Sequence, residues 1–353
     1  MKALILAGGS GSRLRPITFS MAKQLLPVAN KPVIEYGIEQ IARAGIREFG
    51  IIIGDTGDAV RAALGDGSRW GIELTYIPQA APLGLAHAVR TAQPFLQDDP
   101  FVMFLGDNLL KSSIEGLVQE FEAHQPAATI LLAEVPNPSQ FGVAEMAGER
   151  VVRLEEKPAS PRSNLALVGV YLFSPQIHSV IETLQPSARG EYEITDAIQG
   201  LIDAEGEVRS VRVEGWWKDT GTVEAILEAN RLILEDLSSG LAGEVEQSAV
   251  EGRVQIGRGT VVRNSTIRGP VVIAENCHIE ESFIGPFTSI DAGTRVIRSE
   301  IENSIVLSEC SILDVPARIS SSLLGRGVRV VRSEGRPQVS RLVLGDSSSV
   351  ELP

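Results

Sequence analysis

A repeat in the last third of the chain constrains the fold more than any other feature of the sequence. Aliphatic residues recur at steps of six, six and five positions, which gives a period of 17 residues over four successive coils. Such a period is typical of a hexapeptide β-helix, a triangular prism with one strand on each side. An ordinary antiparallel sheet, the alternative, would alternate without this shared period. The corner residues are Val250, Ile256, Val262, Ile267, Ile273, Ile279, Ile284, Ile290, Val296, Ile301, Leu307 and Leu313, with Ile319, Leu324 and Val330 as looser continuations.

The first two thirds of the chain follow a different pattern, in which short apolar runs alternate with amphipathic segments. Unbroken apolar strands between helices predict an α/β fold with a Rossmann-like, doubly wound, mostly parallel sheet. A small, polar stretch at 237–249 indicates a linker. We therefore expect a catalytic domain over 1–240 and a β-helix domain over 241–353, with a tail at 333–353 capping the last coil. Strands are expected at 2–7, 49–54, 72–77 and 101–106, and helices at 31–46 (beginning with Pro32), 58–64 and 83–96.

Composition limits the class of partner. The 353 residues carry a net charge of −13, which argues against nucleic acid or an anionic membrane surface as the main partner. No apolar run approaches the ~18 residues of a membrane span, and the N-terminus does not resemble a signal peptide. The two cysteines, Cys277 and Cys310, lack the spacing of a metal site and suit a reducing compartment. These features predict a cytoplasmic protein.

The stretch LAGGSGSRLRP (6–16) follows the first expected strand. It is not a P-loop, because no Gly-Lys pair follows the glycines, and Leu14 breaks the dinucleotide fingerprint at its third glycine. Backbone N–H groups in such a turn can bind an anion, and Arg13 or Arg15 can grip phosphate oxygens. The alternative is a tight turn whose arginines are solvated.

Further motifs follow in order along the first 230 residues: K-Q-L-L-P-V from Lys23, G-D-N from Gly106, E-E-K-P from Glu155, E-I-T-D from Glu193 and K-D-T-G-T from Lys218. As a set, with the glycine–arginine loop, they resemble the sugar-1-phosphate nucleotidylyltransferases. The chain looks most like the long-form glucose-1-phosphate thymidylyltransferases, which carry a C-terminal left-handed β-helix. The stretches 53–79 and 82–89 also look like the long form.

The resemblance implies a reaction of dTTP with glucose 1-phosphate that gives dTDP-glucose and pyrophosphate. The attacking phosphate is already ionised at neutral pH, so the site needs positioning and charge neutralisation rather than a general base. By resemblance, Leu6, Gly8, Ser10 and Gly11 enclose the nucleotide, Arg13 holds the triphosphate and Lys23 neutralises the α-phosphate or pyrophosphate. Gln79 and Gly84 read the base; Gly142, Glu156, Glu191 and Trp217 line the sugar pocket; Lys157 binds the sugar phosphate; and Asp107 and Asp219 hold Mg²⁺.

Each of these residues also has a structural interpretation. Lys23 and Lys157 could be solvated loop residues, and Asp107 could occupy an ordinary turn. Asp219 could cap the helix expected near Thr222, and Glu191 could be a first-turn acid of the helix that follows it. Gln79 and Trp217 could serve packing alone. The four histidines, His87, His124, His178 and His278, show no ligand spacing and are interpreted as structural.

Alternatives of function stay open at this point. A relative could use UTP or another sugar 1-phosphate, because thymine and uracil differ by a single methyl group, worth roughly 1 kcal/mol in a pocket. A non-catalytic regulatory subunit would keep the fold and bind sugar nucleotides. Acyl transfer on the β-helix would depend on His278, but its surroundings fit a plain coil corner. Assembly into a homo-oligomer is the role we expect for the β-helix.

Overall fold

A computed structural model describes residues 1–333 and 342–351. The chain forms two compact units, and the division does not follow the sequence order. Unit 1 comprises 1–10, 21–25 and 33–219, and unit 2 comprises 11–20, 26–32 and 220–353. The β-helix strands begin at Gly240. A catalytic domain that extends to residue 240 stays a proposal.

Unit 1 is built around a mixed sheet in the order β10-β9-β11-β6-β1-β4-β5, with β8 and β12 branching from β11. The strands β6, β1, β4 and β5 are parallel neighbours, whereas β9, β10 and β11 join the sheet in antiparallel pairs. The strands are β1 (Lys2–Ala7), β4 (Glu48–Ile53), β5 (Glu73–Pro78), β6 (Phe101–Leu105), β8 (Ala128–Glu134), β9 (Gly142–Ala147), β10 (Arg150–Glu156), β11 (Leu165–Phe173) and β12 (Val208–Arg212).

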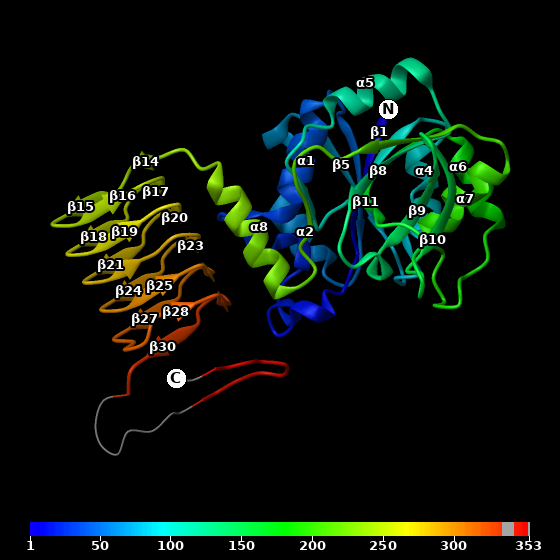
Figure 1. The fold of residues 1–353 in the computed structure, drawn as a ribbon. Coiled ribbons are helices and arrows are strands. Elements are labelled where there is room, and N and C mark those ends of the chain that lie inside the picture. The colour runs from blue at the N-terminus through cyan, green and yellow to red at the C-terminus, as the bar shows by residue number, and fades with distance from the viewer. Residues whose placement is uncertain (334–341, 352–353) are drawn as a thin grey trace. The chain divides into compact units, whose positions relative to one another are not determined.

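Helices cover both faces of this sheet, which explains the unbroken apolar strands (Figure 1). In β1, Leu4 packs into the core on one face while Ala3 and Ile5 pack into the core on the other. The helices are α1 (Val33–Arg43), α2 (Gly57–Leu64), α3 (Leu85–Thr91), α4 (Gln93–Leu96), α5 (Glu115–His124), α6 (Gln176–Thr183) and α7 (Ile194–Asp203). A separate ribbon pairs β7 (Asn108–Leu110) with β13 (Trp217–Asp219).

Two helix predictions needed correction. Pro32 does not begin the first helix, because it pairs with Pro27 in a small hairpin of β2 (Pro27–Val28) and β3 (Lys31–Pro32). The helix expected over 83–96 is two helices, α3 and α4, which meet around Ala92. Pro94 lies in the first turn of α4, the position where a proline is tolerated, rather than inside one long helix.

Unit 2 contains the predicted β-helix, whose strands stack as rungs from β14 to β30 in three parallel sheets (Figure 1). The repeat holds because inward aliphatic residues stack directly on one another: Val262 pairs with Ile279, and Ile279 with Val296. The strands are β14 (Gly240–Leu241), β15 (Glu244–Glu246), β16 (Ala249–Glu251), β17 (Val254–Ile256), β18 (Val261–Arg263), β19 (Thr266–Arg268), β20 (Val271–Ile273), β21 (His278–Glu280), β22 (Phe283–Ile284), β23 (Thr288–Ile290), β24 (Arg295–Ile297), β25 (Glu300–Glu302), β26 (Ile305–Val306), β27 (Ser311–Leu313), β28 (Ile319–Ser320), β29 (Leu323–Leu324) and β30 (Arg329–Val331).

The repeat prediction was wrong by one residue in the fourth coil. Ile290 pairs with Val306 and Val296 with Ile312, so these two residues, rather than Leu307 and Leu313, continue the inward rows. The coil is one residue shorter at this corner. Pairing resumes where the sequence predicted, since Ile319, Leu324 and Val330 occupy the next rung.

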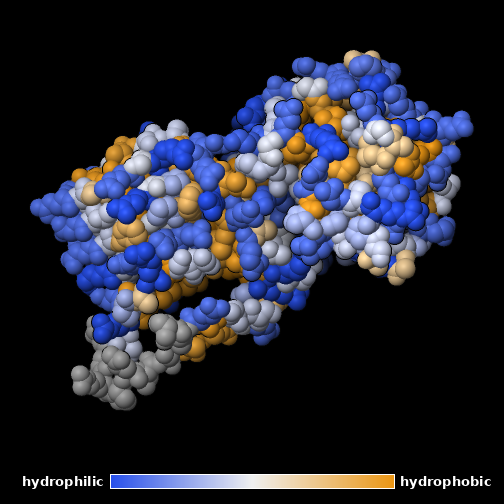
Figure 2. Space-filling model, in the orientation of Figure 1, coloured by the Kyte–Doolittle hydropathy of each residue, from blue (hydrophilic) through white to orange (hydrophobic). Residues whose placement is uncertain are grey.

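Polar ladders hold the coils together. Ser282 donates its N–H to Ser265 Oγ (3.0 Å), and Ser299 donates to Ser282 Oγ (3.2 Å), one coil apart. Ion pairs such as Arg263–Glu246 and Arg298–Asp314 join exposed side chains of successive coils. Figure 2 shows hydrophilic residues at the outer tips of the coils in the face drawn. The His278 side chain is one third exposed, with Nε2 3.0 Å from Glu280 Oε2.

Three other parts of unit 2 precede the β-helix. The segment 11–20 carries two short 3₁₀ helices, η1 (Ser12–Leu14) and η2 (Ile17–Phe19), and helix α8 (Val223–Glu235) leads into the coils. The β2–β3 hairpin lies against α8.

Cys277 and Cys310 are both buried and free. Over residues 1–333 and 342–351, no helix is long and apolar enough to cross a membrane. The tail predicted to cap the last coil lies partly outside the described residues.

The fold class predicted from the sequence is confirmed: a Rossmann-like sheet is followed by parallel coils of a left-handed β-helix. The sheet is more mixed than expected.

Candidate active site

The predicted nucleotide loop and the G-D-N motif leave the sheet at the same edge. Strands β1 and β6 run parallel with Leu6 opposite Leu105, so Gly8 and Gly106 follow neighbouring strand ends. The Gly106 N–H donates to the Leu6 carbonyl (3.0 Å). Leu6 is buried and Ser10 is exposed. A Cβ on Gly9 would lie 2.9 Å from Cε of Lys23, so this glycine leaves room for the lysine side chain.

Lys23 and Asp107 form an ion pair at this edge. Lys23 lies in the short helix η3 (Lys23–Leu25), and its Nζ contacts Asp107 Oδ2. Their side chains are only 18% and 11% exposed, so neither is a solvated loop residue. A partly buried cation held beside a carboxylate at the end of parallel strands provides charge where an anionic ligand would bind.

Asp219 is brought to the same place by the β7–β13 ribbon. Asp219 is register-paired with Asn108, the residue after Asp107. The Asn108 side chain donates to Asp107 Oδ1 (3.1 Å) and accepts from Trp217 Nε1 (2.5 Å). Asn108 therefore links three predicted site residues, and the sequence analysis did not assign it a role. Its place in the G-D-N motif was the available signal.

The interpretation of Asp219 as a helix cap is wrong. Thr222 caps α8, because its Oγ1 accepts from the Ala225 N–H (3.2 Å). Glu191 is likewise not a first-turn acid, since α7 begins at Ile194 and its first-turn acid is Asp196.

Asp107, directly before β7, and Asp219, at the end of β13, offer hard carboxylate oxygens. Such a pair fits a divalent cation that takes its remaining ligands from phosphate oxygens and water. Within the part of the chain that the structure describes, no three His, Cys, Asp or Glu side chains gather as a complete metal cage would.

The predicted base-reading pair lies further along the same edge. Gln79 follows β5 directly, and its N–H donates to the Ile53 carbonyl (2.9 Å). Gly84 has φ +104°, and a Cβ there would lie 2.5 Å from the Tyr192 carbonyl oxygen, so only glycine fits. Gln79 Nε2 lies 2.8 Å from His87 Nδ1. His87, expected to be structural, therefore contacts a predicted site residue.

Two of the predicted sugar residues, Gly142 and Glu156, lie opposite each other on β9 and β10. Gly142 pairs with Glu156, and a Cβ on Gly142 would lie 3.0 Å from Glu156 Oε2 and 2.6 Å from Thr195 Cγ2. Glu156 Oε2 accepts from Thr195 Oγ1 (3.3 Å). Lys157, next along the chain, has φ +43° and a side chain 42% exposed, with Nζ 3.9 Å from Glu156 Oε1.

Arg189 joins the acidic residues of this region, which the sequence analysis did not foresee. Its guanidinium lies 3.3 Å from Glu156, 3.3 Å from Glu191 and 3.4 Å from Glu193. Burial, and then the charge of Glu193, raises the pKa of Glu156, while Lys157 and Arg189 oppose the shift. The cluster can accept hydrogen bonds from hydroxyl groups, with Arg189 balancing its charge.

Two predicted residues, Gly11 and Arg13, belong to unit 2. Gly11 has φ +63° and precedes η1, which carries Arg13. The loop is closed by Thr18, whose Oγ1 donates to the Gly11 carbonyl (2.7 Å). Arg13 and Arg15 are both exposed, and the Arg15 guanidinium stacks over the Phe19 ring at 4.8 Å.

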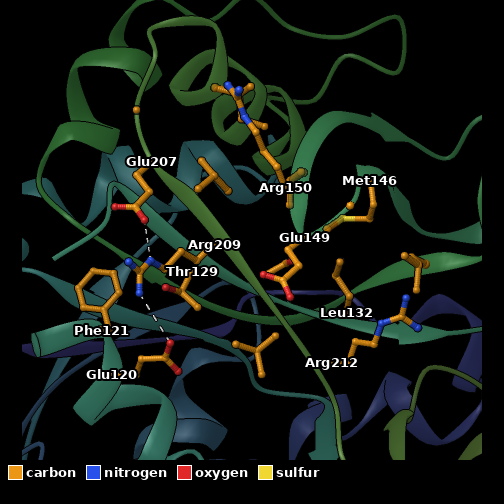
Figure 3. Close-up of a pocket in the computed structure, with 18 of the residues that line it drawn as sticks. Glu120, Phe121, Thr129, Leu132, Met146, Glu149, Arg150, Glu207, Arg209 and Arg212 are labelled. Atoms are coloured by element: carbon orange, nitrogen blue, oxygen red, sulfur yellow. Dashed lines mark hydrogen bonds and ion pairs between the residues drawn. The ribbon is translucent and has the colours of Figure 1, made fainter. Parts of the chain in front are cut away.

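A groove of about 930 Å³ lies elsewhere in unit 1, between α5, β10 and β12 (Figure 3). Its lining mixes charges, and Arg209 is already paired with Glu207 and Glu120. None of the predicted site residues lines this groove.

Comparison with known proteins places the chain in a family. The nucleotidyl transferase model matches residues 2–236. A glucose-1-phosphate thymidylyltransferase of Streptomyces griseus is 52% identical over 100% of this chain and 99% of its own length. A low-salt glycan biosynthesis nucleotidyltransferase of Haloferax volcanii is 48% identical over 100% of both chains. A solved structure from Bacillus anthracis, in complex with sucrose, is 38% identical with a TM-score of 0.64 and covers 68% of this chain and 97% of its own.

The chain belongs to the nucleotidyl transferase family, in the branch of the long-form glucose-1-phosphate thymidylyltransferases. The predicted family and enzyme class are confirmed. Enzymes of this family generally depend on a metal ion, which agrees with the carboxylate pair.

Proposed function

We propose that the protein transfers a thymidylyl group from dTTP to glucose 1-phosphate, giving dTDP-glucose and pyrophosphate. The observation that carries the proposal is the linked group of Lys23, Asp107, Asn108 and Trp217, with Asp219 opposite Asn108. It gathers a partly buried cation and two carboxylates at the carboxyl edge of the sheet, where α/β folds bind nucleotides. The thymidylyltransferase relatives support the same substrates.

The residues then take the following roles. A phosphate oxygen of glucose 1-phosphate attacks the α-phosphorus of dTTP, and pyrophosphate departs in line. Lys23 and Arg13 neutralise the negative charge that the two substrates bring together. Leu6, Gly8, Ser10 and Gly11 enclose the nucleotide, and Gln79 with Gly84 reads the base. Lys157 binds the sugar phosphate, while Gly142, Glu156, Glu191 and Trp217 line the sugar pocket.

Asp107 and Asp219 are the residues that would hold Mg²⁺. When bound, this ion would neutralise phosphate charge beside the reacting phosphorus. Asn108 keeps the Asp107 carboxylate oriented through Oδ1, and Lys23 balances the charge on Oδ2. UTP is the expected second nucleotide substrate, because a pocket gains little from the thymine methyl group. The cytoplasmic location and a homo-oligomeric assembly stay predictions.

Pyrophosphate release tests this function. The wild-type protein with Mg²⁺ should release pyrophosphate only when dTTP and glucose 1-phosphate are both present. Lys23→Gln should lower the rate about a hundredfold or more, the usual cost of removing a group that stabilises developing charge. Arg209→Gln, a change of equal charge in the groove of Figure 3, is the matched control and should keep the rate. Equal rates in Lys23→Gln and the control would refute the assignment of Lys23.

A further inference from the structure

His87 contacts the predicted base reader in a way that determines which atom of Gln79 is available. Gln79 Nε2 lies 2.8 Å from His87 Nδ1 and 3.5 Å from the Gly84 carbonyl oxygen. A side-chain amide nitrogen carries two hydrogens, so these two acceptors use both of them. Among the described residues, no hydrogen-bond donor is paired with Gln79 Oε1. The amide therefore presents an acceptor.

That acceptor points toward the nucleotide loop. Gln79 Oε1 lies 3.4 Å from the position that a Cβ on Gly8 would occupy. Gly8 and Gln79 follow strands of the same parallel edge. A ligand lying on the glycine loop would thus meet a carbonyl oxygen at this point rather than an N–H group.

A neutral His87 ring can accept a hydrogen bond at one of its two nitrogens. Burial lowers the pKa of His87, and the positive charge of Arg90 lowers it further, so the ring is neutral at pH 7. The ring stacks against Tyr192 at 6.2 Å between centroids, and Arg90 lies over the same tyrosine at 4.8 Å. A neutral ring with its hydrogen on Nε2 leaves Nδ1 free to accept from Gln79.

We infer that His87 is a positioning residue that fixes the Gln79 amide with Oε1 toward the nucleobase. The site then selects bases whose ring nitrogen carries a hydrogen at this position. Thymine and uracil carry N3–H and can donate to Oε1. Cytosine has an unprotonated N3, and two acceptors would then face each other. This inference rests on the proposed function of the site and extends it to the origin of base selectivity.

Two substitutions separate positioning from packing. His87→Phe keeps an aromatic ring against Tyr192 but has no acceptor, so the Gln79 amide is free to turn its NH₂ group toward the base. His87→Gln loses the ring but supplies an acceptor oxygen. If His87 acts through packing alone, His87→Phe should lose less selectivity for dTTP over dCTP than His87→Gln. If His87 positions the Gln79 amide, His87→Phe should lose more.

The test measures direct binding of dTTP and dCTP to the full-length protein by titration calorimetry. We expect the dissociation constant of dCTP divided by that of dTTP to fall about tenfold in His87→Phe, which equals 1.4 kcal/mol. In His87→Gln this ratio should stay within threefold of wild type. A ratio within twofold of wild type in His87→Phe overturns the inference. An equal loss in both variants also overturns it, because the acceptor would then have no part.

Binding keeps this inference distinct from the proposed reaction. If wild-type protein prefers dTTP over dCTP but forms no nucleotide-sugar, the transferase function fails while the binding ratios still decide the role of His87. If wild-type protein does not distinguish dTTP from dCTP, the inference fails whether or not transfer occurs.

Discussion

Asn230 is a fully buried polar residue whose replacement should destabilise unit 2. It lies in α8 with none of its surface exposed. Its Oδ1 accepts from the Ala29 N–H (2.8 Å) and from Ser289 Oγ (2.7 Å), and its Nδ2 donates to the Phe287 carbonyl (3.0 Å). One amide thus connects the β2–β3 turn, α8 and a β-helix coil.

The magnitude follows from the groups left behind. Asn230→Leu has a similar volume, so packing changes little, but the Ala29 N–H and the Phe287 carbonyl lose their partner. Each buried backbone group without a hydrogen bond costs ~1–3 kcal/mol. The two backbone groups, counted near the middle of this range, give an expected loss of about 4 kcal/mol in the free energy of unfolding, and the lost acceptor of the Ser289 hydroxyl adds to it.

Urea denaturation of the full-length protein measures this loss. Glu224→Gln, an exposed change on the same helix, is the control and should shift the free energy by less than ~0.5 kcal/mol. Backbone hydrogen exchange of residues 26–32 should rise in Asn230→Leu and not in the control. A loss below ~1 kcal/mol would show that the three hydrogen bonds do not hold the segments together.

Three further outcomes follow from the site and the core. Asp219→Asn should nearly abolish pyrophosphate release while the melting temperature stays close to wild type, and an active variant would exclude Asp219 from the metal site. Removal of divalent ions with a chelator should stop the reaction and added Mg²⁺ should restore it; turnover that persists in the chelator would contradict a metal requirement. Burial lowers the pKa of His178, whose ring stacks on Phe101, so the unfolded chain takes up a proton near pH 6.5 before the folded one does. Its contribution to stability is full above pH 6.5 and is lost as the pH falls through the lower folded pKa. His178→Phe should therefore narrow the difference in melting temperature between pH 7.5 and pH 5.5. An unchanged difference would show that His178 does not titrate on unfolding.

Much of the fold could be predicted because its signals are local and periodic. The strand at Lys2–Ala7 was predicted with its observed bounds, and the 17-residue period located the inward rows of the β-helix up to Ile301. The period failed at Val306 and Ile312, because one coil is a residue shorter and the neighbouring Leu307 is also apolar. Hydrophobicity alone does not choose between adjacent aliphatic residues.

The site was harder to predict where it depends on distant parts of the chain. The glycine loop, Lys23 and Asp107 stand in recognisable motifs, but the pairing of β13 with β7 joins residues about 110 positions apart. The roles of Asn108 and Arg189 depend on contacts with Trp217 and Glu156, which lie far from them along the chain. His87 was interpreted as structural because the histidines show no ligand spacing, and its partner, Gln79, lies after β5 and not on its own helix.

The most direct test of the proposed function is a product analysis with competing substrates. Wild-type protein is incubated with Mg²⁺, equal concentrations of dTTP, UTP, dCTP, ATP and GTP, and equal concentrations of glucose, galactose and mannose 1-phosphates, and the nucleotide-sugars are separated by chromatography. We predict dTDP-glucose as the main product, with UDP-glucose next. The proposed function would be contradicted by a folded protein that binds dTTP yet forms no nucleotide-sugar. It would also be contradicted by a main product that carries another base or another sugar.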